Sequence, residues 1–374
     1  MPLHFRDPLS GGVYQHKGRI RSSRMNGWIG AIRNLDAAAL WDSLQFVKID
    51  QTSNVFGAFA NELYGYVATL SATNYRIVSL SYPQAQVGDA FFELIAATAL
   101  PGTPTLSSFA ASAGGGPVGG VFVYAGHSYR VETNVYTASR TAFSSITSAR
   151  DVLWSEYGNQ YVACGSNGDG GSVEVSPEGQ TWTTQANATS TDIYSKIACD
   201  LTGRYILVAP TANNIWGYSD DGGATWAKYT VSVDGDASPN PTGIAYDDRR
   251  GVWLATFLDS AFSGDGLKVW SNANPTTATW AATATQVPSS GLVGETVAAI
   301  SGILVLGDLW LATTYSTSHG HGNVMISTDG GVTWGVACAL NGTSVSPPKI
   351  YRSGSYIIAG DANTAGAISG PVYI

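Results

Sequence analysis

Two histidines stand one residue apart in this sequence, a pattern that could bind a metal ion. His319 and His321 flank Gly320 in a polar stretch, and histidine is the commonest metal-ligating side chain. A metal site needs three or four convergent ligands, however, and no carboxylate or third histidine lies nearby in the sequence. We therefore expect an ordinary polar loop between two strands, and no metal ion or cofactor.

Paired carboxylates could hydrolyse a glycosidic bond if they faced each other across roughly 5–9.5 Å. The candidates lie in expected loops between the second and third strands of a repeated unit, and in the last unit: Asp169, Asp259, Asp265 and Asp361. An aspartate that merely begins a turn looks the same in a sequence. The loop around Asp169 also has too few ligands for a dedicated calcium site. We nominate no catalytic residue, and keep His319, His321, Asp169 and Asp265 as loop candidates for binding.

A repeated turn indicates the structural units that would hold such loops. Residues 219–226 read Ser-Asp-Asp-Gly-Gly-Ala-Thr-Trp and residues 327–334 read Ser-Thr-Asp-Gly-Gly-Val-Thr-Trp. We expect the aspartate to bind backbone N–H groups two residues on, the glycines to supply positive φ, and the tryptophan to anchor the next strand. The structural positions of the two copies are then Ser219, Asp221, Gly223, Trp226, Ser327, Asp329, Gly331 and Trp334.

Two looser copies of this turn extend the pattern. Ser176–Trp182 is one residue shorter and carries Glu178 in place of the aspartate, and Ser271–Trp280 keeps its ends but loses the Asp-Gly centre. The tryptophans at 182, 226, 280 and 334 are therefore 44, 54 and 54 residues apart. Four short antiparallel strands with their turns need roughly 40–50 residues, which is the unit of a β-propeller blade.

The Ser-x-Asp-x-Gly-x-Thr-Trp pattern resembles the Asp-box of the BNR repeat family. That family includes sialidase-like propellers, sortilin-type receptors, some xyloglucanases, photosystem assembly factors and many phage structural proteins. The resemblance covers roughly residues 150–345 and implies an all-β propeller. Among its members, we place this chain with the phage structural proteins.

Short apolar runs separated by polar, Gly-rich turns precede each tryptophan, as expected for strands. The third strand before Trp280 is expected at Leu267–Trp270, and the middle strand before Trp334 at Leu304–Leu306 or Trp310–Thr314. We expect seven blades, with the strand Trp28–Ile32 completing the last blade and so removing two exposed edges. Six blades is the alternative, because residues 96–147 show no recognisable copy of the turn. The domains are then an extended N-terminal arm, 1–24, and a propeller, 25–374.

Composition and charge limit the function. Charged residues make up 12% of the chain, and the net charge is −8 with only six lysines. This disfavours a nucleic-acid-binding surface, which needs clustered positive charge. No apolar run is long enough for a signal peptide or a membrane span. Three widely spaced cysteines argue against disulfides and a zinc site. Together with the resemblance to this family, the lack of an export signal implies a virion protein made in a host cytoplasm.

An enzymatic alternative comes from the sialidase branch of the family. That resemblance would imply an arginine cluster, a tyrosine nucleophile with a glutamate partner, and an aspartic acid. The branch's early Arg-Ile-Pro signature is approached only by Arg19-Ile20-Arg21, which lacks the proline. A sialidase-like glycoside hydrolase acting on surface glycans therefore remains the alternative to a non-enzymatic protein.

The first 24 residues differ from the rest of the chain in charge. They hold five cationic side chains and one carboxylate, together with proline and glycine, and show no periodic apolar pattern. They are expected either to dock onto a neighbouring virion subunit or to be a terminus without a role. We expect a structural or host-attachment protein of a phage tail, whose loops could bind a host surface glycan or protein. A third interpretation is an assembly factor that associates with particles only transiently.

Overall fold

The structure is a computed structural model of the 374-residue chain. It describes seven stretches almost in full, and elsewhere the strands with a few adjoining residues. The seven stretches are residues 138–211, 214–233, 241–257, 269–277, 279–282, 297–316 and 322–340.

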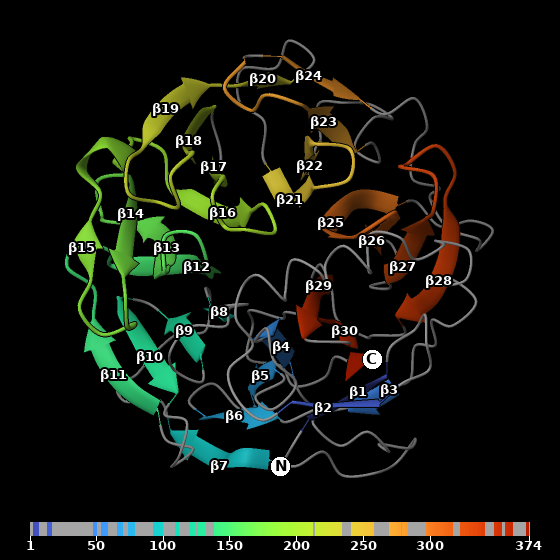
Figure 1. The fold of residues 1–374 in the computed structure, drawn as a ribbon, viewed down its shortest axis with the longest axis horizontal. Helices are drawn as coiled ribbons and strands as arrows, with labels where there is room; N and C mark the ends of the chain where they lie inside the picture. The colour runs from blue at the N-terminus through green and yellow to red at the C-terminus, as the bar shows by residue number, and fades with distance from the viewer. Residues whose placement is uncertain are drawn as a thin grey trace.

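The described strands form seven sheets of four or five strands, arranged in a ring (Figure 1). Consecutive strands within each sheet pair antiparallel, and five of the seven sheets are each built from four successive strands. In these five sheets the strands lie side by side in chain order. The first contains β4 (Asn54–Ala58), β5 (Tyr66–Thr69), β6 (Asn74–Val78) and β7 (Glu93–Ala99), and the second β8 (Phe109–Ala111), β9 (Gly120–Tyr124), β10 (His127–Val131) and β11 (Ala138–Ala142). The next three contain β12 (Ser148–Ser155), β13 (Gln160–Ser166), β14 (Gly171–Ser176) and β15 (Thr183–Thr184); β16 (Tyr194–Cys199), β17 (Ile206–Pro210), β18 (Ile215–Ser219) and β19 (Ala227–Thr230); and β25 (Val297–Leu306), β26 (Leu309–Ser316), β27 (Gly322–Ser327) and β28 (Gly335–Leu340).

Two sheets recruit a strand from elsewhere in the chain. The short β20 (Ser232–Val233) adds to the outer strand of the sheet β21 (Pro241–Asp247), β22 (Val252–Phe257), β23 (Trp270–Asn272) and β24 (Thr279–Ala282), and pairs with β24 in parallel. The last sheet contains β29 (Pro348–Ser353), β30 (Tyr356–Asp361) and β31 (Val372–Tyr373), and is completed by β3 (Lys48–Asp50).

The ring therefore closes with a strand from near the N-terminus, as expected, but the expected strand is wrong. Lys48 pairs with Tyr373 and Asp50 with Val372, whereas Trp28–Ile32 lies outside the described residues. The physical reason is connection length. Only three residues separate β3 from β4, so the chain passes directly to the neighbouring sheet, and short connections between adjacent elements are the rule.

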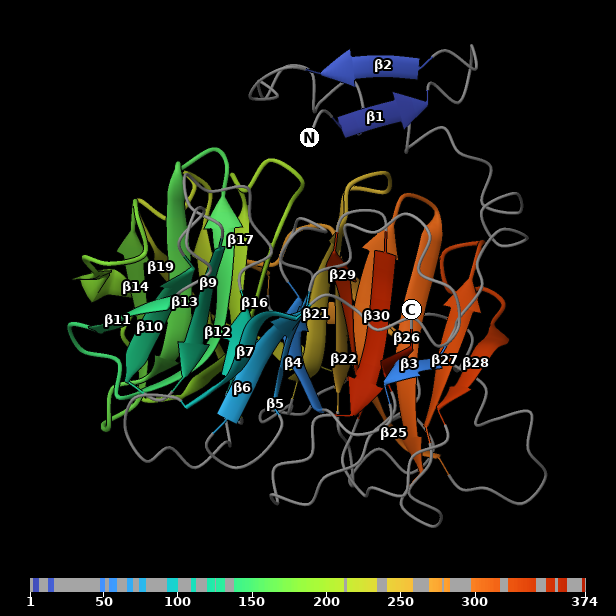
Figure 2. The ribbon, with the colours of Figure 1, turned by 90° about the horizontal axis from the view of Figure 1, so that it is seen from below.

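The N-terminal arm also differs from the expected extended chain. β1 (Leu3–Arg6) and β2 (Val13–His16) pair antiparallel, with Leu3 opposite His16. The Pro-Leu-Ser-Gly-Gly stretch between them supplies turn residues. Among the described strands, this hairpin pairs with none from the ring, and Figure 2 shows it beside one face.

One of the two options for a middle strand is confirmed, and one expected strand is shifted. Trp310–Thr314 lies in the second strand, β26, whereas Leu304–Leu306 belongs to the first strand, β25, because Gly307 turns the chain with φ 61°. The third strand before Trp280 begins at Trp270 instead of ending there. The other strand runs expected between residues 151 and 326 all fall on strands of the structure.

The core lies between neighbouring sheets. One cluster joins strands β12–β14 with β16 and β17, and includes the fully buried Val162, Val173 and Ile206 beside Trp226. Burying apolar surface between sheets stabilises each by about 1.5–3 kcal/mol for every large side chain, so each sheet depends on its neighbours. No helix in the described part of the chain has the length and apolar character needed to cross a bilayer.

Candidate functional site

The repeated turn joins the third strand of a sheet to the fourth, and it closes on itself through side chains. In residues 219–226, the hydroxyl of Ser219 donates to Oδ1 of Asp221 at 2.9 Å and accepts from the N–H of Gly223 at 2.9 Å. The Asp221 carboxylate accepts from the N–H and the hydroxyl of Thr225 at 2.8 and 2.6 Å. The carboxylate thus binds four residues on, and the expected reach of two residues is wrong, because two glycines with positive φ lengthen the turn.

Residues 327–334 repeat this geometry. The Ser327 hydroxyl donates to Asp329 at 2.8 Å, and Asp329 accepts from the N–H and the hydroxyl of Thr333 at 2.8 and 2.6 Å. Burial raises the pKa of both aspartates, but the hydrogen bonds from the threonine and serine outweigh it and leave the pKa of each below its usual value. These carboxylates are committed to their own turns.

In each sheet, the turns between first and second strands and between third and fourth strands lie at the same end, because consecutive antiparallel strands reverse direction. We call these the rim turns. Gly222, in a rim turn of sheet β16–β19, lies directly against Gly158, in a rim turn of sheet β12–β15: a Cβ on Gly222 would come within 2.6 Å of the Gly158 nitrogen. Gln160 donates to the Gly222 carbonyl at 3.0 Å. The glycine-centred turn therefore clamps one sheet to the preceding one.

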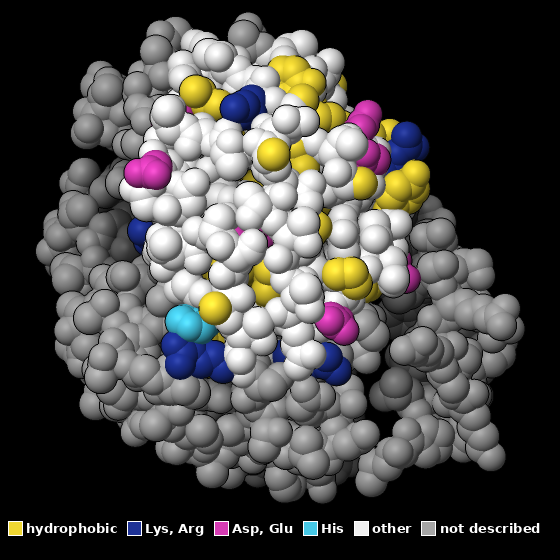
Figure 3. All heavy atoms as spheres, turned by 90° about the vertical axis from the view of Figure 1, so that its left-hand side faces the viewer, with side chains coloured by type: hydrophobic (Ala, Val, Ile, Leu, Met, Phe, Trp, Pro, Cys, Tyr) yellow, Lys and Arg dark blue, Asp and Glu magenta, His cyan; other side chains and the backbone are white. Residues whose placement is uncertain are grey.

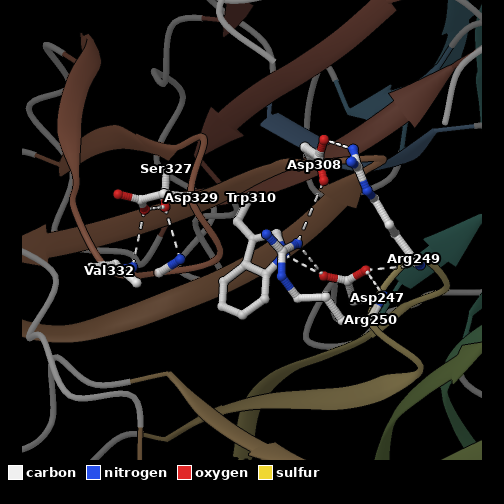
Figure 4. Close-up of polar contacts among 9 residues, drawn as sticks. Asp247, Arg249, Arg250, Asp308, Trp310, Ser327, Asp329 and Val332 are labelled. Atoms are coloured by element: carbon white, nitrogen blue, oxygen red, sulfur yellow. Dashed lines mark hydrogen bonds and ion pairs between the residues drawn. The ribbon is translucent and has the colours of Figure 1, made fainter. Parts of the chain in front are cut away.

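A second clamp joins sheets β20–β24 and β25–β28 (Figure 4). Arg250 packs against Gly330, where a Cβ would come within 2.7 Å of the guanidinium, and its Cζ lies 5.4 Å from the centre of the Trp310 ring. The fully buried Asp247 accepts from Arg250 at 2.9 Å and from the Trp310 indole N–H at 2.8 Å. Arg249 forms an ion pair with Asp308.

The shorter copy, Ser176–Trp182, clamps its sheet to β10 in a different way. The Ser128 hydroxyl of β10 donates to the Gly179 carbonyl at 3.1 Å and accepts from the Trp182 indole N–H at 2.8 Å. Glu178 only accepts from the Thr181 hydroxyl at 3.2 Å. The clamp therefore depends on the glycine, and tolerates loss of the aspartate.

The fourth copy has no glycine and closes with asparagines. Asn272 accepts from the N–H of Asn274 at 2.9 Å, and Asn274 accepts from the N–H of Thr276 at 3.1 Å. This turn lacks the glycine whose bare backbone the faithful copies place against the preceding sheet, and its Trp280 ring lies 5.4 Å from that of Trp216 in sheet β16–β19. At this rim, a hydrogen bond joins the β16–β17 turn to the β21–β22 turn: the N–H of Leu201 donates to the Asp248 carboxylate at 3.2 Å.

Tyrosines occupy the rim between sheets β16–β19 and β20–β24. Tyr205, Tyr218, Tyr229 and Tyr246 are each partly exposed, and we call them the tyrosine surface. The Tyr218 ring stacks on Tyr205 at 6.5 Å and meets Tyr229 edge-on at 6.4 Å. Beneath them, the buried Trp253 lies 6.4 Å from Tyr218 and 4.8 Å from Tyr246. The inter-sheet core thus extends to the surface as aromatic rings.

Carboxylates surround this aromatic group. Burial, and next the charge of Asp220, raise the pKa of Tyr218 to about 12. Burial, followed by Asp248 and Asp200, raises the pKa of Tyr246. The hydroxyls of Tyr218 and Tyr246 therefore stay protonated and can donate at neutral pH. Within the described residues, none of the four tyrosine hydroxyls forms a hydrogen bond.

Three further exposed side chains border the tyrosine surface. Arg204 lies 5.1 Å from the centre of the Tyr205 ring and 5.7 Å from that of Tyr157. Tyr157 is 58% exposed and Leu201 39% exposed. Large exposed apolar side chains beside free hydroxyls and carboxylates are typical of a recognition surface, not of a catalytic centre.

The enzymatic alternative requires a tyrosine and a carboxylate, and the innermost strands carry the described residues that come closest to this requirement. Burial, and next the charge of Asp151 on β12, raise the pKa of Tyr351 on β29 well above its usual value. This is the opposite of what a tyrosine nucleophile needs. Asp151 itself accepts from the N–H groups of Val152 and Ile197 at 2.9 and 3.2 Å. The arrangement gives a partly buried tyrosine and a carboxylate held by the backbone.

The structure describes few of the candidates named from the sequence. Asp169 is exposed in the β13–β14 turn, where its own N–H donates to Asn167 at 3.0 Å. Asp361 ends β30. The remaining candidates, His319, His321, Asp259, Asp265 and the Arg19–Arg21 run, lie outside the described residues. The described part of the chain contains no group of three side chains that could hold a metal ion.

The cysteines are free where their side chains are described. Cys164 is buried and Cys199 partly buried. Burial raises the pKa of both thiols, that of Cys199 to about 12, so neither is a reactive nucleophile.

Sequence reasoning missed the tyrosine surface because its members come from three strands and one turn. A usable signal was the loss of the Asp-Gly centre in Ser271–Trp280, which removes a clamp. The Asp247–Arg250 clamp could also have been found, since four consecutive charged residues are conspicuous in a chain with 12% charged residues.

Charge on the described surface is sparse. On the side of the ring drawn in Figure 3, acidic and basic side chains lie scattered among uncharged polar ones, and basic side chains gather mainly along one edge beside a histidine. A guanidinium nitrogen of Arg140 lies 2.7 Å from Nε2 of His127.

Comparison with known proteins shows the fold and no more. No family model and no curated protein sequence matches the chain. A solved structure described as "YCF48 bound to D1 peptide" matches with a TM-score of 0.55 and 10% identity, over 88% of this chain and 95% of that one. YCF48 from Cyanidioschyzon merolae matches with a TM-score of 0.54 and 14% identity, over 88% and 97%. The predicted all-β propeller is thus confirmed.

Proposed function

We propose that this chain is a non-enzymatic recognition module, in which a rigid ring presents the tyrosine surface to a protein partner. The observation that carries the proposal is the unclamped rim with four partly exposed tyrosines whose hydroxyls have no described partner. Tyrosine is enriched at protein interfaces and among their energetic hot spots, because it combines apolar area with a hydrogen-bonding group. The structure described as YCF48 bound to a D1 peptide supports a peptide-binding use of such a ring.

The resemblance of the repeated turn to the Asp-box suggests the setting. We place the chain in a phage particle, as a structural or host-attachment component of the tail. Its partner would then be a neighbouring virion subunit or a protein of the host surface. Supporting this, the ring has closed edges, which suits a permanent part of an assembly.

Binding to the parent particle and to its host cells tests this function. The labelled full chain is compared with Tyr218→Ala and with Val332→Ala, which removes an apolar side chain that is 59% exposed in a clamped rim turn. We expect Tyr218→Ala to weaken binding at least about tenfold, since interface tyrosines often contribute more than about 1.4 kcal/mol. Val332→Ala should bind as the wild type. Equal binding by all three proteins would contradict the proposal.

The enzymatic alternative has its own test. Tyr351 and Asp151 on the innermost strands are the groups that a sialidase-like hydrolase would use here. We expect no release of reducing ends from a panel of surface glycans. Release that disappears in Asp151→Asn would replace the recognition module by a glycoside hydrolase.

A further inference from the structure

We propose that the tyrosine surface of one copy binds the basic segment 1–24 of a second copy of this chain. This deepens the proposed function, on which it rests, by naming the partner. The proposal stands on charge, on aromatic chemistry and on the position of the segment.

The charges of the two surfaces are opposite. Segment 1–24 holds five cations and one carboxylate, in a chain whose net charge is −8; the cations are Arg6, Lys17, Arg19, Arg21 and Arg24. The tyrosine surface is bordered by Asp200, Asp220 and Asp248, which lie near enough to the tyrosine hydroxyls to raise their pKa values. Opposite charges steer two copies together and fix the register of the contact.

The chain already uses the required contact at the edge of this surface. Arg204 lies over the rings of Tyr205 and Tyr157, and its Nε donates to the Asp220 carbonyl at 3.0 Å. Guanidinium groups bind favourably to aromatic faces and to carboxylates together. The remaining rings, Tyr218, Tyr229 and Tyr246, offer the same chemistry to arginines from outside.

The hydroxyls provide the second half of recognition. The hydroxyls of the four tyrosines have no hydrogen-bond partner in the described residues, and a hydroxyl group can donate a hydrogen bond. A peptide that lies along the rim presents backbone carbonyls as acceptors at regular spacing. The surface can therefore bind both the side chains and the backbone of a basic segment.

The position of the segment points to a second copy instead of the same chain. Figure 2 shows the hairpin β1–β2 apart from the ring, beside one face, and in Figure 1 it lies across the ring centre from β18 and β21, which carry Tyr218 and Tyr246. The hairpin pairs with no described strand of its own ring. A hairpin held away from the tyrosine surface of its own ring is available to a neighbour, as in exchange of arms between subunits.

Complementation between two full-length variants tests this arrangement. The arm variant carries Lys17→Gln, Arg19→Gln, Arg21→Gln and Arg24→Gln, and the surface variant carries Tyr218→Ala and Tyr246→Ala. Sedimentation measures association of the wild type, of each variant alone and of their equimolar mixture. Melting temperatures check that both variants are folded, and Val332→Ala serves as the surface control.

We expect the wild type and Val332→Ala to associate, each variant alone to be monomeric, and the mixture to recover association through the one intact arm and the one intact surface. Association of the wild type should weaken at least about tenfold between about 0.1 M and 1 M salt, where the screening length falls from about 10 Å to about 3 Å. A synthetic peptide of residues 1–24 should bind the arm variant and not the surface variant.

Three outcomes would overturn the proposal: a monomeric wild type, a surface variant that associates like the wild type, or a mixture of variants that stays monomeric. If the arm variant nevertheless binds particles or host cells as the wild type does, while the surface variant does not, the proposed function stands and only this partner is wrong. If the surface variant is normal in both assays, both proposals fail.

Discussion

The rim of the ring is built in two ways, and the difference follows one residue type. Between sheets β12–β15 and β16–β19, Gly222 packs against Gly158, and between sheets β20–β24 and β25–β28, Gly330 packs against Arg250. Between sheets β16–β19 and β20–β24, the corresponding turn contains asparagines, and tyrosines occupy the rim. A glycine-centred turn closes the gap by backbone contact, and its loss leaves space that aromatic side chains cover.

The comparison teaches that repetition and recognition occupy different parts of this rim. The faithful copies of the turn hold sheets together, so their carboxylates and glycines have structural roles within the fold. The degenerate copy releases a section of rim for binding. In this account, the faithful copies of the repeated turn stabilise the ring, and the degenerate copy lies where the binding surface forms.

Breaking a clamp should have the largest effect on stability. Gly222→Ala introduces a Cβ at φ 76°, within 2.6 Å of the Gly158 backbone. We expect the free energy of unfolding to fall by about 2–4 kcal/mol, from backbone strain and displacement of the neighbouring sheet together. Urea denaturation measures the change.

Gly168→Ala is the matched control for this substitution. Gly168 has φ 97°, and a Cβ there would meet no atom within 4 Å. It should cost only about 1–2 kcal/mol, the strain of a left-handed residue. Equal losses at Gly168 and Gly222 would show that the clamp contributes nothing beyond backbone strain.

Removing the buried charge of the second clamp should have the next largest effect. Asp247 is fully buried and accepts hydrogen bonds from Arg250 and Trp310. Asp247→Asn replaces charge-assisted hydrogen bonds by weaker ones and leaves Arg250 only the more distant carboxylate of Asp308, at 3.9 Å, as counter-charge. This should cost about 2–3 kcal/mol in chemical denaturation. Asp248→Asn, the neighbouring and partly exposed carboxylate of the unclamped rim, should cost less than about 1 kcal/mol. The comparison fails if the two costs are reversed.

At the unclamped rim, a substitution should weaken association strongly and lower stability only slightly. Tyr218→Ala removes a partly exposed ring, so we expect a loss of about 1 kcal/mol or less in unfolding free energy. Its association, measured by sedimentation, should weaken at least about tenfold. A large loss of stability with unchanged association would make the tyrosine surface a second kind of clamp.

The smallest expected effect concerns acid. Hydrogen bonds keep the pKa of Asp221 and Asp329 below the unfolded value of about 3.9. Their contribution to stability is present above that pH and is lost as the pH falls through the folded pKa. The double variant Asp221→Asn, Asp329→Asn should therefore show a smaller fall in melting temperature between about pH 5 and pH 2. An unchanged profile would mean that these carboxylates do not titrate with folding.

The sequence predicted the class of fold because the repeated turn is local: its serine, aspartate, glycines and tryptophan act within eight residues, as in 219–226. It predicted closure of the ring but missed β3, since Lys48–Asp50 is a short and mostly charged stretch that only its pairing with the distant β31 identifies as a strand. The tyrosine surface depends on which residues of neighbouring sheets meet at the rim. Tyr218 and Tyr246 belong to no common local pattern, so no spacing along the chain reveals them.

Amide hydrogen exchange tests the central contrast most directly, by comparing two turn amides that each donate to one side-chain acceptor. The Thr225 N–H donates to Asp221 in a clamped turn, and the Thr276 N–H donates to Asn274 in the unclamped one. We predict that Thr225 exchanges only through large-scale unfolding, whereas Thr276 exchanges by local opening, at least about tenfold faster than Thr225. Equal protection of the two amides would contradict the account.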